Sequence, residues 1–125
     1  MTKRLRAGLL GLVFVGTLGL AACDPGSSGA VALSPAQDAI NIAFGPLAPQ
    51  ATRVAQCESS LNPAAVSPGG GNWGLFQINT AHRGRVEAMG YRWEDLLDPR
   101  VNSLVAKSIF DEQGWRPWGC RAAAR

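Results

Sequence analysis

The order of apolar and polar positions divides the chain into an apolar stretch near the start and a longer part with helical periodicity. Residues 9–20 carry no charge and are almost wholly apolar. After residue 34, apolar side chains recur every three or four positions, which is the spacing of an amphipathic helix. Glycine and proline separate this part into segments, and we expect helices over residues 35–44, 49–59, 80–89 and 99–113, with a further turn over 93–97. The apolar stripe of the last helix is expected to comprise Val101, Leu104, Val105 and Ile109.

The predicted helix ends carry their own sequence signatures. Ser34 and Asp98 each stand directly before a proline, which combines a side-chain N-cap with proline at the first helical position. Asn79 or Thr80 is the predicted cap of the third helix. Gly114 is expected to end the last helix in the left-handed conformation.

The segment between the second and third helices has no helical pattern. Residues 64–74 are rich in glycine and predict a loop, and the region 66–79 is expected to be irregular or a small hairpin. If residues 75–79 are extended, one side carries Leu75, Gln77 and Asn79, and the other side carries the core residues Phe76 and Ile78. If the stretch instead opens a helix, only Gln77 faces a cleft. The fold class is therefore mainly α.

The first 22 residues have the organisation of an export signal. Lys3, Arg4 and Arg6 precede the apolar stretch, which is too short to cross a membrane comfortably. Small residues then lead to Cys23, and this junction resembles the bacterial lipobox, in which the cysteine becomes the lipidated N-terminus. The alternative is an ordinary secretory signal with a chance cysteine. We expect a signal peptide over 1–22, a lipidated cysteine and flexible tether over 23–33, and a folded domain over 34–125.

Removal of this signal changes the net charge of the chain and therefore the partners that we expect. The chain has 12 Lys and Arg against 9 Asp and Glu. Three of the basic residues lie in the signal, so the mature part has 12 − 3 = 9 basic and 9 acidic groups and no net charge. A neutral surface gives no reason to expect nucleic-acid binding. Acyl chains on Cys23 would anchor the protein to the outer face of the cytoplasmic membrane or elsewhere in the cell envelope, and we expect a monomer.

The three cysteines are consistent with export. An odd number of thiols in an exported protein needs an explanation. If Cys23 is lipidated, Cys57 and Cys120 remain as one pair, which should oxidise outside the cytoplasm. The alternative is two free buried thiols. One histidine and a paired set of cysteines do not make a zinc site, so we expect no metal and no cofactor.

Glu58 is the candidate catalytic residue. It follows Ala51, Val54 and Ala55 on one side of the predicted helix, which places a carboxyl at the C-terminal edge of an apolar face. Partial desolvation and the negative end of the helix both favour the protonated form, and a protonated carboxyl can donate to a glycosidic oxygen. The alternative is a surface glutamate at a frayed helix end.

Four motifs in fixed order carry a family resemblance. They are Glu58-Ser59, then Asn62-Pro63-Ala64-Ala65-Val66-Ser67, then Gly74-Leu75-Phe76-Gln77, then Asp98-Pro99 with Asn102 and Ala106. From about residue 54 to residue 120 the chain resembles the lytic transglycosylase SLT family of the lysozyme-like superfamily. The resemblance implies a small, goose-type or SLT-like helical domain with a glycine-rich loop or minor hairpin and one disulfide.

The resemblance also implies a reaction. Glu58 matches the family's sole catalytic acid and base, which cleaves the bond between N-acetylmuramic acid and N-acetylglucosamine in peptidoglycan glycan strands and leaves a 1,6-anhydro end. The chain departs from the pattern at the family's C-terminal tyrosine, since the only tyrosine is Tyr91. Cys57 beside the glutamate is similar to the resuscitation-promoting-factor branch. Two alternatives therefore stay open: a muramidase that hydrolyses the bond, and a catalytically silent lipoprotein that binds the cell wall.

Further site residues are predicted from the same family resemblance or from their position in the glycine-rich loop. Ser67 matches a family serine that hydrogen-bonds in the active site, and the alternative is an ordinary turn serine before Pro68. Gln77 matches the glutamine of a conserved family stretch, and we expect it and Asn79 to bind substrate. Trp73 lies in the glycine-rich loop and is either a sugar-stacking platform or partly buried. Asn102 is expected to be a structural polar group that positions the catalytic helix. The glycines at 69–71 and 74 suit a backbone that approaches a sugar or a flexible loop, and His82 is expected on a helix surface rather than as a base.

Overall fold

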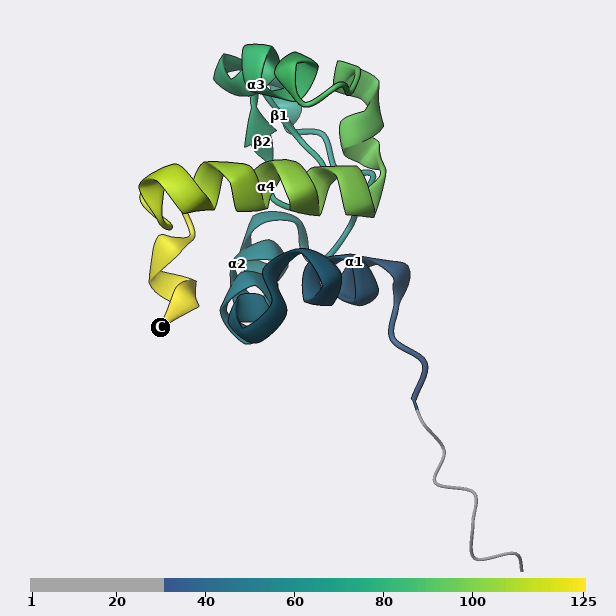
Figure 1. Cartoon of the computed structure of the whole chain (residues 1–125), viewed down its shortest axis with the longest axis vertical. Helices are drawn as coiled ribbons and strands as arrows, with labels where there is room; N and C mark the ends of the chain where they lie inside the picture. The colour runs from purple at the N-terminus through teal and green to yellow at the C-terminus, as the bar shows by residue number, and fades with distance from the viewer. Residues whose placement is uncertain (1–30) are drawn as a thin grey trace, which may run out of the picture. The chain divides into compact units, whose positions relative to one another are not determined.

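The computed structural model describes residues 31–125 (Figure 1). The predicted signal peptide, the Cys23 lipidation site and most of the tether lie outside the described residues. Within residues 31–125, no helix has both the length and the apolar character needed to cross a bilayer.

The structure is mainly helical, as predicted. Its α-helices are α1 (Pro35–Phe44), α2 (Ala48–Ser59), α3 (Arg83–Ala88) and α4 (Pro99–Gln113). Short 3-10 segments connect them: η1 (Gly45–Leu47), η2 (Pro68–Gly70), η3 (Thr80–His82), η4 (Trp93–Leu97) and η5 (Arg121–Ala124). Strands β1 (Asn72–Trp73) and β2 (Ile78–Asn79) pair antiparallel, with Asn72 opposite Asn79 and Trp73 opposite Ile78. The predicted small hairpin is therefore confirmed.

The predicted N-caps are present. The Ser34 hydroxyl accepts from the Gln37 N–H (3.2 Å), and the Asp98 carboxylate accepts from the N–H groups of Arg100 and Val101. Each cap satisfies donors that the first turn of a helix leaves free.

Two predicted features of the helices need correction. The helix expected over 80–89 is present over residues 80–88 with the predicted Asn79 cap, but its first turn, η3, is a 3-10 turn and only α3 is α-helical. Gly114 ends α4 with φ 61° and ψ −151°, which is outside the left-handed helical region.

Helix α4 crosses the middle of the unit, with α1 and α2 on one side and α3 and the hairpin on the other (Figure 1). Its buried face differs in part from the predicted stripe. Val105 and Ile109 are buried as expected and Val101 is half-buried, but Leu104 is 39 % exposed. The inner face instead includes Asn102, Ser103 and Ala106, all fully buried, and Asn102 forms hydrogen bonds there with Phe76 and Trp73 of the hairpin.

The segment between the two strands is a turn rather than an extended strand or a helix start. Leu75, Phe76 and Ile78 are all buried, so Leu75 does not share a solvent-facing side with Gln77 as the extended alternative required. Gln77 has φ 48°, which reverses the chain within this turn. The side-chain alternation of a strand therefore does not apply here.

Asn102 holds this turn against helix α4. Its Oδ1 accepts from the Phe76 N–H (2.9 Å), and its Nδ2 donates to the carbonyls of Trp73 and Leu96 (both 2.9 Å). A Cβ on Gly74 would lie 2.1 Å from Asn102 Nδ2, so this glycine is required by close packing within the protein rather than by a sugar. Asn102 is structural, as predicted, but its bonds go to the hairpin and η4 rather than to α2.

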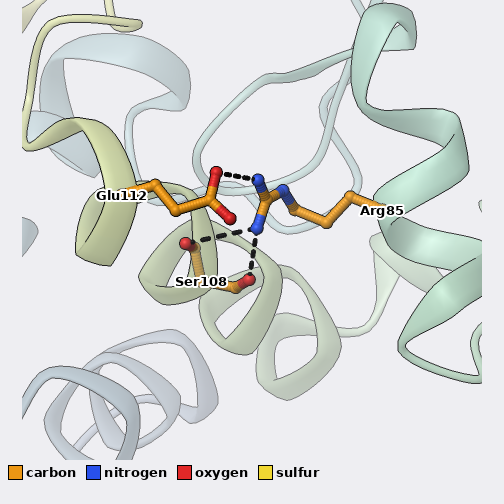
Figure 2. A network of polar contacts seen from close by, with 3 residues as sticks. All are labelled: Arg85, Ser108 and Glu112. Carbon is orange, nitrogen blue, oxygen red and sulfur yellow. Dashed lines mark hydrogen bonds and ion pairs between the residues drawn. The ribbon is translucent and has the colours of Figure 1, made fainter.

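A second polar contact fixes α3 to α4. The Arg85 guanidinium donates to the Ser108 hydroxyl (2.7 Å) and carbonyl (3.4 Å) and forms an ion pair with Glu112 (Figure 2). The planar guanidinium thus holds two acceptors on successive turns of α4. This contact sets the position of the η3–α3 segment relative to α4.

Candidate active site

A cavity of about 370 Å³ lies where the end of α2, the hairpin, η3, α4 and the C-terminal segment meet. Its lining residues are Glu58, Asn72, Gln77, Ile78, Asn79, His82, Ile109, Pro117, Trp118 and Gly119. Glu58 is the only carboxylate in this set, and the rest of the lining combines amide side chains and the His82 imidazole with apolar surface. A cavity with a few convergent polar groups on an apolar wall is typical of a ligand site.

Glu58 lies in the last turn of α2, half-buried at the wall of the cavity. Its Oε1 accepts a hydrogen bond from the backbone N–H of Cys120 (3.0 Å). The disulfide between Cys57 and Cys120, predicted from the cysteine count, is present and brings these two segments together across 63 residues of sequence. The carboxyl is therefore oriented by a backbone group that the disulfide holds in place.

The chain turns sharply directly after Glu58. Ser59 Oγ donates to the Leu75 carbonyl (2.7 Å), which ties the end of α2 to the turn of the hairpin. Ser60 and Leu61 then adopt left-handed backbone conformations with φ 55° and 59°. Such conformations cost non-glycine residues about 1–3 kcal/mol each. Stored strain beside the candidate acid is typical of a functional site.

Gln77 and Asn79 lie in the cavity wall, where the sequence placed them. Gln77 Nε2 donates to the carbonyls of Ala65 (3.2 Å) and Gly74 (3.0 Å), so its amide is held by the loop backbone. Asn79 Nδ2 donates to Asn72 Oδ1 (2.9 Å) across the hairpin. Hydrogen bonds to other protein groups thus fix the orientation of both amides.

Ser67 and Trp73 lie outside the set of lining residues. Ser67 Oγ accepts from the Asn72 N–H (3.0 Å), so the hydroxyl supports a lining residue from behind. Trp73 is half-buried, donates from Nε1 to the Gly70 carbonyl (2.9 Å) and meets Trp93 edge-to-face at 6.0 Å. The structure therefore shows the partly buried alternative for Trp73, and its sugar-stacking role stays a prediction.

His82 is closer to the site than the sequence indicated. It is half-buried and lines the cavity rather than lying on an outer helix surface. Burial and the nearby Arg85 guanidinium lower the pKa of the His82 imidazole from its ordinary value of 6.5, while Glu112 acts in the opposite direction. At neutral pH the ring is therefore an uncharged hydrogen-bonding group. Within residues 31–125, no cluster of three His, Cys, Asp or Glu side chains could hold a metal ion.

The sequence of the helical domain matches a known protein family. The model of the transglycosylase SLT domain matches residues 43–116, which is more than half of the chain. The chain belongs to the transglycosylase SLT family. This family contains cell-wall enzymes that cleave glycan strands, and the SLT domain of this chain has the mainly helical, lysozyme-like fold with one disulfide that the sequence predicted.

The SLT domain also resembles curated proteins. It is 36 % identical over 63 residues to the invasion protein IagB of Salmonella typhimurium (strains SL1344 and LT2) and of Salmonella typhi. The match covers 47 % of this chain and 39 % of each relative, so the chain spans about two fifths of the length of the curated relatives it matches. No solved structure matches the chain significantly.

Several lining residues of the SLT domain were not predicted. Asn72 lines the cavity and forms hydrogen bonds with Ser67 and Asn79. Trp118 also lines the cavity, and its Nε1 donates to the Phe76 carbonyl (2.9 Å). Gly119 lies directly against the acid, since a Cβ there would be 3.9 Å from Glu58 Oε1. The predicted disulfide was the signal that could have placed residues 118–120 beside Glu58.

Proposed function

We propose that this protein is an exported lytic transglycosylase that cleaves peptidoglycan glycan strands, with Glu58 as the catalytic acid and base. The observation that carries the proposal is the single carboxylate among the lining residues of the cavity. Enzymatic cleavage of glycosidic bonds ordinarily uses a pair of carboxyl groups, about 5–5.5 Å apart for retention or 6.5–9.5 Å for inversion. A reaction whose nucleophile belongs to the substrate needs only one.

In the proposed reaction, protonated Glu58 donates to the oxygen that joins N-acetylmuramic acid to N-acetylglucosamine. The bond from the muramic C1 to that oxygen breaks, and the leaving sugar keeps the proton as a hydroxyl. The muramic 6-hydroxyl then attacks C1 and gives its proton to the Glu58 carboxylate, which restores the acid. The Cys120 N–H, 3.0 Å from Glu58 Oε1, keeps the carboxyl in the same orientation through both steps.

Export and lipidation are part of the proposal. The charged start, the apolar stretch and Cys23 support a lipoprotein signal. The Cys57–Cys120 disulfide is consistent with an oxidising compartment. Mass spectrometry of the protein isolated from cells should show an acylated N-terminal Cys23. A mature N-terminus elsewhere, or an unmodified Cys23, would contradict this part.

Glu58→Gln tests the assigned acid. The amide keeps the size of the side chain and an oxygen that can accept from Cys120, but it has no proton to deliver. Loss of a general acid typically lowers the rate by about 10²–10⁴-fold, so the turbidity of purified cell walls should remain nearly constant.

The matched control is Glu87→Gln, an exposed glutamate on α3, which should retain the wild-type rate. Circular dichroism and thermal unfolding show whether both variants are folded. A folded Glu58→Gln protein with wild-type activity would overturn the assignment. Binding to walls with no soluble product from the wild-type protein would indicate the silent wall-binding protein instead.

A further inference from the structure

A second depression adjoins the cavity at Gly119. It has a volume of about 450 Å³ and is lined by Trp115, Arg116, Gly119, Arg121, Ala122 and Arg125. Gly119 also lines the cavity that holds Glu58. A residue without a side chain therefore borders both hollows.

The adjoining depression has cationic side chains. Three of its six lining residues are arginines, and no lining side chain is acidic. Among residues 31–125, the four ion pairs join acidic side chains to Arg85, Arg92, Arg100 and Lys107. The three arginines of the depression are thus left without a carboxylate partner within the described part of the chain, and such a set attracts anions.

Two of these arginines are partly fixed in position. Arg116 Nε donates to the Gln113 carbonyl (3.1 Å), and Arg121 Nη1 donates to the Trp118 carbonyl (3.5 Å). A guanidinium has five N–H donors, so each group keeps several for a ligand. Arg121 directly follows Cys120, whose N–H donates to Glu58. The backbone of Arg121 therefore lies close to the candidate acid.

We propose that Arg116, Arg121 and Arg125 form a subsite for the carboxylates of the peptide stems that branch from the glycan strand. This rests on the proposed function, because it assigns a peptide-bearing strand as the preferred substrate of the Glu58 site. The shared Gly119 favours a ligand in which an anionic branch is attached to the glycan. Guanidinium groups bind carboxylates in a planar, two-point geometry.

The test compares purified cell walls with the same glycan strands after an amidase has removed the peptides. The wild-type protein should cleave peptide-bearing strands faster. In Arg116→Gln/Arg121→Gln, the ratio of the two rates should fall by about tenfold, as expected for two solvent-exposed charged contacts. Arg100→Gln removes an exposed arginine at the other end of α4 that is paired with Asp38, and it should leave the ratio unchanged.

Co-sedimentation with intact walls gives a readout that needs no catalysis. The double variant should bind about tenfold more weakly than wild type at low salt, and the difference should vanish at high salt because exposed charges are screened. An unchanged rate ratio together with unchanged binding would overturn the subsite. Binding that is lost when hydrofluoric acid removes phosphate polymers from the walls would also overturn it, in favour of a polymer site. Failure to find any cleaved product would instead count against the proposed function, while the binding result still decides the subsite.

Discussion

Replacement of Asn102 by aspartate changes one atom at the centre of the fold. Asn102 is fully buried, and its Nδ2 donates to the carbonyls of Trp73 and Leu96 at 2.9 Å each. In Asn102→Asp an oxygen replaces this nitrogen and faces two carbonyl oxygens. Only a protonated carboxyl can still donate to one of them, while the other oxygen continues to accept from the Phe76 N–H.

The expected loss of stability depends on pH. Burial and the two carbonyls should raise the pKa of the new carboxyl above the value of about 3.9 in an unfolded chain. Between the two pKa values the native chain binds more protons, so the free energy of unfolding falls by about 1.4 kcal/mol per pH unit as the pH rises. From about pH 4 to about pH 7 the loss approaches about 4 kcal/mol. That is a large part of the roughly 5–15 kcal/mol that stabilises a typical domain.

Urea unfolding followed by tryptophan fluorescence at both pH values measures this effect. The control is Asn62→Asp, an exposed residue whose Oδ1 accepts from the Ala64 N–H (3.0 Å), a bond that aspartate can also make. We expect Asn102→Asp to lose stability relative to this control as the pH rises. If the two variants followed the same pH dependence, the account of Asn102 as the donor that holds the hairpin would be refuted.

Three further predictions concern the disulfide, the loop glycines and the histidine. Cys57→Ala/Cys120→Ala should lower the free energy of unfolding by about 4 kcal/mol, because the bond closes a loop of 63 residues; unchanged urea unfolding would contradict this. Gly74→Ala should cost about 3 kcal/mol or more, since its Cβ would lie 2.1 Å from a buried side chain at φ 77°. Gly71→Ala, with open space around it, should change stability by less than about 0.5 kcal/mol, and equal effects would disprove the packing argument. Because the pKa of His82 is lowered in the folded protein, the unfolded chain binds a proton at higher pH than the folded one, and stability falls as the pH drops below about 6.5. His82→Gln should weaken this decline when thermal unfolding is measured at several pH values, and a decline equal to that of the wild type would contradict the assigned shift.

Features determined by nearby residues could be predicted from the sequence. The caps at Ser34 and Asp98 bond to groups within three residues, so the local pattern contains both partners. The Cys57–Cys120 pair followed from counting cysteines in a chain that was expected to be exported. Glu58 at the end of an apolar helix face followed from periodicity, because the second helix was correctly placed to within one residue at its start.

Features determined by distant contacts could not be predicted. Asn102 contacts groups that lie up to 29 residues away in sequence, and the need for Gly74 becomes visible only when α4 is packed against the turn. His82 lines the cavity from a segment that Arg85 joins to Ser108 and Glu112 of α4, and these contacts have no local signature in the sequence. Leu104 fell outside the buried stripe because polar Asn102 and Ser103 occupy the inner face.

The products released from purified cell walls in water labelled with heavy oxygen test the central claim most directly. If Glu58 passes a proton to the leaving sugar and the muramic 6-hydroxyl closes the ring, mass spectrometry will find anhydro-muramic ends that are lighter by one water and carry no label. These products should disappear in Glu58→Gln. Reducing ends that carry the heavy oxygen would show that water is the nucleophile, and the protein would then be a muramidase.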